Sequence, residues 1–228
     1  MNDLIEESFV KTRNAGFVAA SALKEVQKII KPGVTTDQID KLCYEYIADH
    51  GGLSAPLFYR GFPKSCCTST NHVVCHGIPS NKVLKDGDII NVDVTVFKDG
   101  WHGDTSKTFE VGNVSVKAKK LINVTRTALN KAIQILKDGI QLGDIGSVIQ
   151  NYVESEGCSV VQDFCGHGIG KKFHKEPSIL HFGKKGTGEK IKSGMIFTIE
   201  PMINFGNYET KILNDGWTAV TKDKSLSA

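Results

Sequence analysis

Two aspartates, Asp93 and Asp104, are spaced so that their carboxylates can meet around one cation. Apolar residues alternate over positions 90–96, which predicts a half-buried strand, and Asp99-Gly100 is typical of a two-residue hairpin turn. In that register Asp104 faces Thr95, which points from the same face as Asp93. The carboxylates are then diagonal neighbours with Cβ atoms about 7–8 Å apart. Because like charges at this distance repel, the hairpin predicts a cation between them.

A glycine-rich segment, residues 165–170, contains the next candidate. It places His167 among three glycines, where the backbone can approach a ligand closely, and His174 follows seven residues later. Carboxylate oxygens with one imidazole suit divalent ions such as Mn, Fe, Co or Zn. A histidine such as His167 is, taken alone, more often an ordinary core residue. Four other histidines are interpreted only as ordinary structural residues: His50, His72, His102 and His181. The alternation along the strand nevertheless puts His102 on the same face as Asp104.

An internal repeat runs through the chain. Residues 30–34 resemble residues 136–140 at a displacement of 106, and residues 84–93 resemble residues 191–200 at a displacement of 107. Chance similarity between two helix–turn–helix units is the alternative. The repeat predicts that the chain consists of two similar halves packed about a pseudo-twofold axis.

The repeat adds a third carboxylate to the candidate site. Asp93 and Glu200 end the two matching segments, so we expect both residues at the seam between the halves, about 1–112 and 113–228. A lone aspartate in a strand is usually a turn or surface residue. Several buried acids without a partner would cost on the order of several kcal/mol, so a shared cation is the simpler interpretation.

Helical periodicity and turn residues predict the elements that position these groups. The predicted helices cover residues 3–30, a stretch capped by Thr36 and ended by Gly51-Gly52, residues 116–137, and a stretch from Asp144 to Gly157. The predicted strands, besides the hairpin, cover residues 158–163, 195–200, 208–213 and 217–221.

Composition limits the class of protein. With 228 residues, 40% hydrophobic and 23% charged, the chain is long enough for one large domain with a sizeable core. No apolar run approaches the ~18–20 residues of a membrane span, and the first 16 residues lack the pattern of a signal peptide. The six cysteines form no C-x-x-C pair, so we expect reduced thiols in the cytoplasm.

The net charge of +3 is small, but lysines are clustered in three segments, 117–120, 171–175 and 184–192. Such clusters could contact RNA or a ribosome. They are more often solvated faces.

Several motifs together resemble those of the type I methionine aminopeptidases. They are Asn91-Val92-Asp93-Val94, His102-Gly103-Asp104-Thr105-Ser106, residues 165–170, Phe173-His174, residues 197–201, and residues 74–79 around His76. The similarity runs from about residue 3 to the last residue. It implies the pita-bread fold of that family, an α+β fold in which a central antiparallel sheet is flanked by helices. One catalytic domain, made of the two halves, would span residues 1–228.

The resemblance also implies roles for individual residues. Asp93, Asp104, His167 and Glu200 would be ligands of two divalent ions, Co, Mn, Fe or Zn. The ions activate water for attack on the carbonyl after the first methionine. Glu200 would transfer the proton, His174 would stabilise the tetrahedral intermediate, and His76 would lie near the scissile bond and the leaving amine.

The methionine side chain needs an apolar pocket with polarisable partners. The resemblance places five aromatic or thiol residues at the family's pocket positions: Tyr59, Phe62, Cys67, Phe173 and Trp217. His76 and His174 would border this pocket. One neighbouring position, usually Cys in the family, is Pro56 here.

In the family a final strand follows the segment that matches residues 225–228, and its Glu is a fifth ligand. The sequence stops before that strand, and its acids after Glu200, which are Glu209, Asp215 and Asp223, lie outside the matching motif. Either a C-terminal segment is not part of this sequence, or the site lacks one oxygen ligand. In the second case we expect weak binding of at least one ion and low activity.

The resemblance implies metal-dependent removal of the initiator methionine from nascent N-termini when the second residue is small. The enzyme would be a cytoplasmic monomer that could contact the ribosome but neither membrane nor DNA. One alternative is a proline-directed aminopeptidase of the same fold. The other is a catalytically weak pita-bread module that binds RNA or ribosomes.

Overall fold

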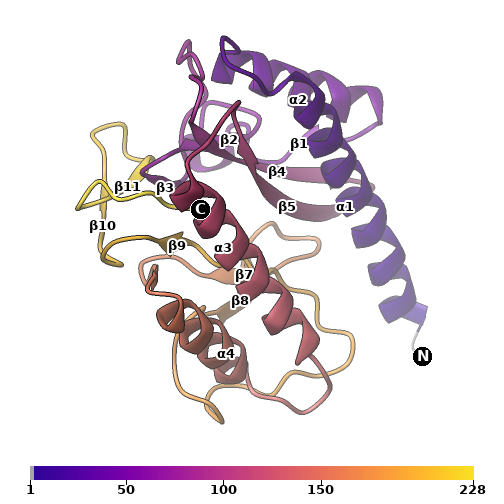
Figure 1. The fold of residues 1–228 in the computed structure, drawn as a ribbon. Coiled ribbons are helices and arrows are strands. Elements are labelled where there is room, and N and C mark those ends of the chain that lie inside the picture. Colours follow the sequence, from indigo (N-terminus) through magenta and orange to yellow (C-terminus); the bar gives the residue numbers. More distant parts are fainter. Residues whose placement is uncertain (1–2) are drawn as a thin grey trace.

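The computed structural model describes residues 3–228, which form four α-helices, one short 3-10 helix and eleven strands (Figure 1). The helices are α1 (Asp3–Ile29), α2 (Thr36–Asp49), α3 (Val116–Gln134) and α4 (Leu142–Ser155), and the 3-10 helix is η1 (Tyr59–Gly61). Every pair of neighbouring strands is antiparallel. The predicted α+β arrangement of antiparallel sheets and flanking helices is confirmed.

The longest strands form the predicted hairpin, β4 (Ile89–Lys98) and β5 (Trp101–Glu110). Asp104 lies opposite Thr95, as predicted, and the register continues without a bulge. β1 (Leu53–Ser54) and β2 (Cys67–Thr70) pair with the other edge of β4 at its two ends. The hairpin is thus the centre of the sheet that carries two of the candidate acids.

Helices α1 and α2 lie against this sheet (Figure 1) and bury one core with it. The core includes Val26 of α1, Ile39 and Ile47 of α2, and Val92 and Val94 of β4.

The cap of α2 is Thr35, not Thr36 as predicted. The Thr35 hydroxyl accepts the Gln38 N–H at 3.2 Å. The Thr36 hydroxyl is engaged with Ser80, from a distant loop, so the first of the two threonines is left to cap the helix.

The second part of the chain packs α3 and α4 over smaller sheets, and these elements share another core that includes Leu121, Ile145, Ile149 and Ile179. The sheets are β6 (Ser159–Val160) with β9 (Ile203–Asn204), and β7 (Gly166–Gly168) with β8 (Lys175–Ile179).

The predicted limits of α3 and α4 were partly wrong. Helix α3 ends at Gln134, earlier than predicted. Helix α4 has Gln141 as its N-cap residue, and Asp144, the predicted cap, lies inside the first turn. There the Asp144 carboxylate accepts the Gln141 N–H at 2.9 Å.

Two predicted strands are shorter or absent. The strand expected over residues 158–163 is only β6. Residues 195–200 form no strand, and Phe197 alone makes an isolated bridge to Gly168. The reason lies in the hydrogen bonds at the end of this segment, because the Glu200 N–H donates to the His181 ring at 3.1 Å and Pro201 has no N–H.

A third sheet joins the two parts, in the order β10 (Thr210–Ile212), β11 (Ala219–Thr221), β3 (Val73–Cys75). The predicted strands near 208–213 and 217–221 are present as β10 and β11. Among residues 3–228, no helix is long and apolar enough to span a membrane.

Gly103 of β5 allows α1 to lie directly on the sheet. A Cβ atom at Gly103 would overlap the backbone of Ala15 and Gly16. We expect Gly103→Ala to destabilise the protein by about 1–3 kcal/mol, because helix and sheet would have to separate. The measurement is urea unfolding followed by circular dichroism.

Gly16→Ala is the matched control for this contact. A Cβ atom at Gly16 meets nothing within 4 Å, and alanine favours a helix interior by up to about 1 kcal/mol over glycine. We therefore expect this substitution to stabilise the protein. Similar unfolding free energies for both variants would contradict the close contact of α1 with β5.

Candidate active site

Three carboxylates and one imidazole come together between β5, β7 and the segment that ends at Glu200. Nε2 of His167 lies 3.6 Å from Oδ2 of Asp104 and 3.6 Å from Oε1 of Glu200. The carboxyl groups of Asp93 and Asp104 are within hydrogen-bonding distance of each other. The structure therefore places the four candidate ligands, which come from both parts of the chain, in one cluster.

The crowding of the carboxylates changes their acidity. Burial, followed by the charges of Asp104 and Glu200, raises the pKa of Asp93 well above its usual range. Burial and the charge of Asp104 raise the pKa of Glu200 to about 7, although 37% of its side chain is exposed. The cluster thus holds an excess of negative charge that a cation would neutralise.

His167 is held by β7 and by the segment before Glu200. Its N–H donates to the Thr198 hydroxyl at 2.9 Å, and the Thr198 N–H donates to the His167 carbonyl oxygen at 2.9 Å. Burial lowers the pKa of His167, but Asp104 and Glu200 together outweigh burial and raise it.

The glycines on either side of His167 serve close packing between backbones. A Cβ atom at Gly166 would overlap the Thr198 carbonyl, and one at Gly168 would overlap the Glu176 carbonyl. These two glycines therefore allow close packing, and closer approach of a ligand to the backbone around His167 stays a prediction.

His174 lies beside the cluster and is packed among rings. Its ring centroid is 4.1 Å from those of His167 and Phe173, and its Nδ1 is 3.0 Å from the Tyr59 hydroxyl. Although the residue is partly open to solvent, desolvation of the ring and then the charge of His167 lower the pKa of His174 to about 4. His174 is therefore neutral at physiological pH.

His102 belongs to this site although it was interpreted as an ordinary histidine. Its ring stacks on Phe173 at 5.5 Å with an interplanar angle of 13°. Its Nδ1 lies 2.8 Å from the carbonyl oxygen of Gly170, which also accepts the His102 backbone N–H at 2.8 Å. His102 thus fixes Phe173 beside His174. Its position on the same strand face as Asp104 was the signal that could have identified it.

A second ring cluster contains Phe62, His76 and Trp217, together with Phe164, which no sequence signal pointed to. Trp217 meets Phe62 at 5.2 Å and His76 at 6.2 Å, and His76 meets Phe164 at 5.4 Å. All three Trp217 and His76 contacts are edge-on, which is a favourable aromatic geometry.

Cys67, the thiol among the predicted pocket residues, lies on β2 directly opposite Asp93. It is buried, and burial followed by the charge of Asp93 raises the pKa of the Cys67 thiol well above its usual range. Cys67 therefore presents a neutral, polarisable sulfur next to the carboxylates.

Tyr59 is presented by a strained turn. Phe58 and Arg60 have left-handed φ values of 64° and 51°, and each costs on the order of 1–3 kcal/mol at a non-glycine residue. Pro56, at the position where the resemblance expects Cys, is buried, and its carbonyl oxygen accepts the Tyr59 N–H at 2.9 Å. This turn holds the Tyr59 ring 4.9 Å from that of Phe173.

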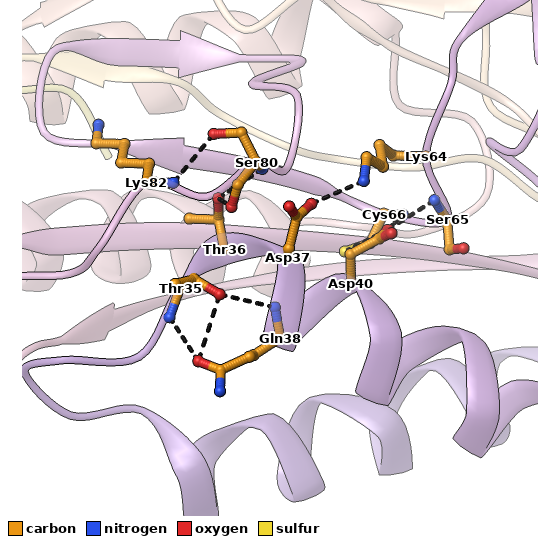
Figure 2. A network of polar contacts seen from close by, with 10 residues as sticks. All are labelled: Thr35, Thr36, Asp37, Gln38, Asp40, Lys64, Ser65, Cys66, Ser80 and Lys82. Atoms are coloured by element: carbon orange, nitrogen blue, oxygen red, sulfur yellow. Dashed lines mark hydrogen bonds and ion pairs between the residues drawn. The ribbon is translucent and has the colours of Figure 1, made fainter.

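The N-terminus of α2 anchors the loop that follows His76 (Figure 2). The Thr36 hydroxyl donates to the Ser80 carbonyl oxygen at 3.0 Å and accepts the Ser80 N–H at 2.9 Å. His76 itself has a left-handed φ of 55°. A Cβ atom at the next residue, Gly77, would overlap the backbone of Thr68, so this loop lies tightly on β2.

The same helix anchors the segment that leads into Cys67. Figure 2 shows the Asp40 carboxylate directed at this segment, where it accepts the N–H groups of Ser65 and Cys66 at 2.7 and 3.1 Å. Burial raises the pKa of Asp40, although these hydrogen bonds oppose the shift. One helix terminus thus positions two loops of the ring-lined region.

A cleft of about 580 Å³ gives access to the carboxylates from the side of α1 and α3. Asp93, Asp104 and Glu200 line it, together with Thr12 of α1 and Arg126 of α3. The ring residues around His174 and Trp217 lie outside this cleft.

The donor set fits a divalent metal ion, because carboxylate oxygens and one imidazole are ligands that Mn, Fe, Co and Zn accept. Within residues 3–228, no three such side chains are already arranged as a cage for an ion. Oε1 of Glu200 accepts the Thr198 hydroxyl at 2.6 Å.

Comparisons with known proteins agree with this site. Residues 10–223 match the model of the family described as Metallopeptidase family M24. The methionine aminopeptidase of Rickettsia prowazekii is 55% identical over 224 residues, which are 98% of this chain and 86% of that protein. The methionine aminopeptidase of Escherichia coli is 51% identical over 224 residues, 97% of this chain and 85% of that protein.

A solved structure is similar over nearly the same range. The crystal structure of the methionine aminopeptidase from Rickettsia prowazekii has a TM-score of 0.97 with this chain and covers 98% of it, with 90% of that chain matched. The predicted pita-bread fold is confirmed. By the family match and by these identities, the chain belongs to metallopeptidase family M24, whose members act with divalent metal ions.

Proposed function

We propose that this protein is a methionyl aminopeptidase that removes the initiator methionine from nascent proteins and peptides when the second residue is small. The observation that supports this most directly is the meeting of three carboxylates with His167, next to the rings of Phe173 and His174. A metal-binding cluster beside an apolar, ring-lined surface suits hydrolysis next to a thioether side chain. The relatives named above, at 51–55% identity, support the same activity.

The proposed cofactors are two divalent ions, Co, Mn, Fe or Zn, with Asp93, Asp104, His167 and Glu200 as their ligands. Such ions, when bound, supply a Lewis acid that polarises a carbonyl oxygen and activates water. Asp104 lies between Asp93 and His167 in the cluster, which supports it as one of the residues that would hold the ions. Titration calorimetry of the metal-free protein would give the number of ions.

His174 is proposed to stabilise the oxyanion that develops at the scissile carbonyl. The imidazole is neutral, and its Nδ1 lies 3.0 Å from the Tyr59 hydroxyl, which we propose is the donor; the ring proton is then on Nε2. Nε2–H is then a donor for the carbonyl oxygen as negative charge develops there. Tyr59 selects this tautomer.

Glu200 is proposed to move the proton from the attacking water to the leaving amine, because it is both part of the cluster and partly exposed. His76 is proposed to lie near the scissile bond and the leaving amine. The proposed methionine pocket consists of two aromatic residues from each ring cluster and the thiol beside Asp93: Tyr59, Phe62, Cys67, Phe173 and Trp217.

The other two candidate activities have less support. A proline-directed aminopeptidase or a weak binding module would not be expected from relatives that share half of their residues with this chain and are named methionine aminopeptidase.

The proposed setting is the cytoplasm, with nascent chains as partners and the protein acting as a monomer. All six cysteines are free thiols, which suits a reducing compartment. The exposed lysines of residues 184–192 are the proposed contact with the ribosome.

Peptide hydrolysis tests the proposed activity. Incubation of the protein with Met-Ala-Ser in the presence of Co²⁺, Mn²⁺, Fe²⁺ or Zn²⁺ should release methionine, and Met-Leu-Ser should be a much poorer substrate. Chelation should abolish the release. Cleavage only of X-Pro peptides would support the proline-directed alternative, and no cleavage with any metal would support the binding module.

Tyr59→Phe tests the role of the hydroxyl at His174. Loss of one hydrogen bond, about 0.5–1.5 kcal/mol, should lower kcat/KM for Met-Ala-Ser roughly 2- to 12-fold. Tyr44→Phe, at an exposed position on α2, is the control and should leave kcat/KM unchanged. Equal rates for both variants would mean that Tyr59 does not select the tautomer of His174.

The contribution of Glu200 to the stability of the metal-free protein should fall as the pH rises through about 7. Burial and the charge of Asp104 raise the pKa of Glu200 to about 7, so at this residue the native state holds a proton more tightly than the unfolded state does. The pKa values of Asp93 and His167 are also raised, so both residues act in the same direction. His174 and His181 act in the opposite direction, because their lowered pKa of about 4 keeps them neutral in the native state, whereas in the unfolded state they titrate near the ordinary value of about 6.5.

Urea unfolding in the presence of a chelator at a series of pH values measures this effect. Glu200→Gln should remove the fall that Glu200 contributes, because the amide does not titrate, whereas Glu189→Gln, at an exposed position, should leave the pH dependence unchanged. A slope in Glu200→Gln equal to that of the unaltered chain would show that Glu200 does not titrate in this window.

A further inference from the structure

We propose that His181 is a positioning residue that fixes the backbone of Glu200 and thereby the placement of its carboxylate in the metal site. His181 follows β8 and is 0% exposed. Its Nε2 accepts the backbone N–H of Glu200 at 3.1 Å. The inference rests on the proposed function, because it assigns a role in holding one of the proposed ligands.

Among the residues that the structure describes, the backbone N–H of Glu200 has no hydrogen-bond acceptor on a neighbouring strand. The preceding residues pair with β7, where the Thr198 N–H donates to the His167 carbonyl oxygen at 2.9 Å. Residues 199–201 then leave that pairing, and Pro201 carries no N–H. A side chain therefore supplies the acceptor that a neighbouring strand would normally supply.

The hydrogen bond requires one protonation state and one tautomer of His181. Because Nε2 is the acceptor, the ring must be neutral and carry its proton on Nδ1. Burial lowers the pKa of His181 to about 4, so the ring is neutral at physiological pH. Within the described part of the chain, the buried Nδ1 has no hydrogen-bond partner.

That unpartnered nitrogen indicates what the imidazole is for. A buried polar group without a partner is destabilising, whereas an apolar side chain at this position would avoid this cost. The apolar side chain would, however, leave the Glu200 N–H without its acceptor. The unpartnered Nδ1 of His181 is thus destabilising, whereas the hydrogen bond at Nε2 holds the backbone of Glu200.

Two hydrogen bonds together define where the Glu200 carboxylate lies. The Thr198 hydroxyl holds Oε1 at 2.6 Å, and His181 holds the backbone of the same residue. Thr198 also accepts the N–H of His167, and β7, which carries His167, pairs with β8 just before His181. His167 and Glu200 are therefore held relative to each other through β7, β8 and His181.

The test compares variants with and without an acceptor at position 181 in the full chain. His181→Phe keeps a ring but has no acceptor, and His181→Gln keeps a neutral acceptor. Titration calorimetry of the metal-free proteins with Co²⁺, and the visible absorption of bound Co²⁺, report on the site without reference to turnover. We expect His181→Phe to bind Co²⁺ about 10- to 100-fold more weakly with an altered spectrum, as for other residues that orient ligands. We expect His181→Gln to restore most of the affinity.

His72→Phe, at an exposed histidine, is the matched control and should bind Co²⁺ like the unaltered chain. If His181→Phe does not fold, His181→Met takes its place as the variant without a nitrogen or oxygen acceptor. Unchanged Co²⁺ affinity and spectrum in the acceptor-free variant, with only a lower Tm, would overturn the proposal, because His181 would then act in packing alone.

Nuclear magnetic resonance of the metal-free chain labelled with [¹⁵N]histidine tests the hydrogen bond directly. The proposal expects an unprotonated Nε2 and a protonated Nδ1 at His181, and the opposite tautomer would overturn it. If the unaltered chain binds no Co²⁺ at all, the proposed metal site fails first and the positioning role fails with it. That outcome differs from the case in which the unaltered chain and the acceptor-free variant bind Co²⁺ equally well.

Discussion

The repulsion between three carboxylates in a partly buried cluster is the constraint on which the rest of the structure depends. Burial and the neighbouring carboxylates raise the pKa values of Asp93 and Glu200, so the metal-free cluster is electrostatically unfavourable. The fold must therefore hold these groups together by other means. The packing of two cores and the joining sheet β3–β11–β10 supply that stabilisation at a distance from the site.

The two parts of the chain hold their acids in different ways. Asp93 and Asp104 lie on one regular hairpin, where the ladder of backbone hydrogen bonds leaves little freedom. Glu200 lies at the end of an irregular segment that is tied to β7 by backbone bonds and to Thr198 and His181 by side chains. The glycines of β7 are small enough for that segment and β8 to approach closely. The site is thus formed from one half held by a regular strand ladder and one half held by individual hydrogen bonds.

The ring-lined region depends on loops whose conformation is costly in isolation. Phe58, Arg60 and His76 all have left-handed backbones, which non-glycine residues rarely adopt. Helix α2 offsets that cost through its first turns, where Thr36 and Asp40 bind the two loops (Figure 2). Helix α2 thus supports the loops of the ring-lined region through hydrogen bonds from its own side chains.

The sequence by itself determined the elements whose geometry is local. The period of two and Asp99-Gly100 predicted the hairpin with its register, because a two-residue turn allows one pairing only, and helical periodicity predicted all four helices within a few residues. Tertiary structure alone decided the rest. By sequence Thr35 and Thr36 are equally good caps, and only the contact with Ser80 distinguishes them. Residues 195–200 have the pattern of a strand, but the N–H of Glu200 donates to His181 instead of to a neighbouring strand. Such choices depend on contacts between residues far apart in the chain, and local propensity carries no information about those contacts.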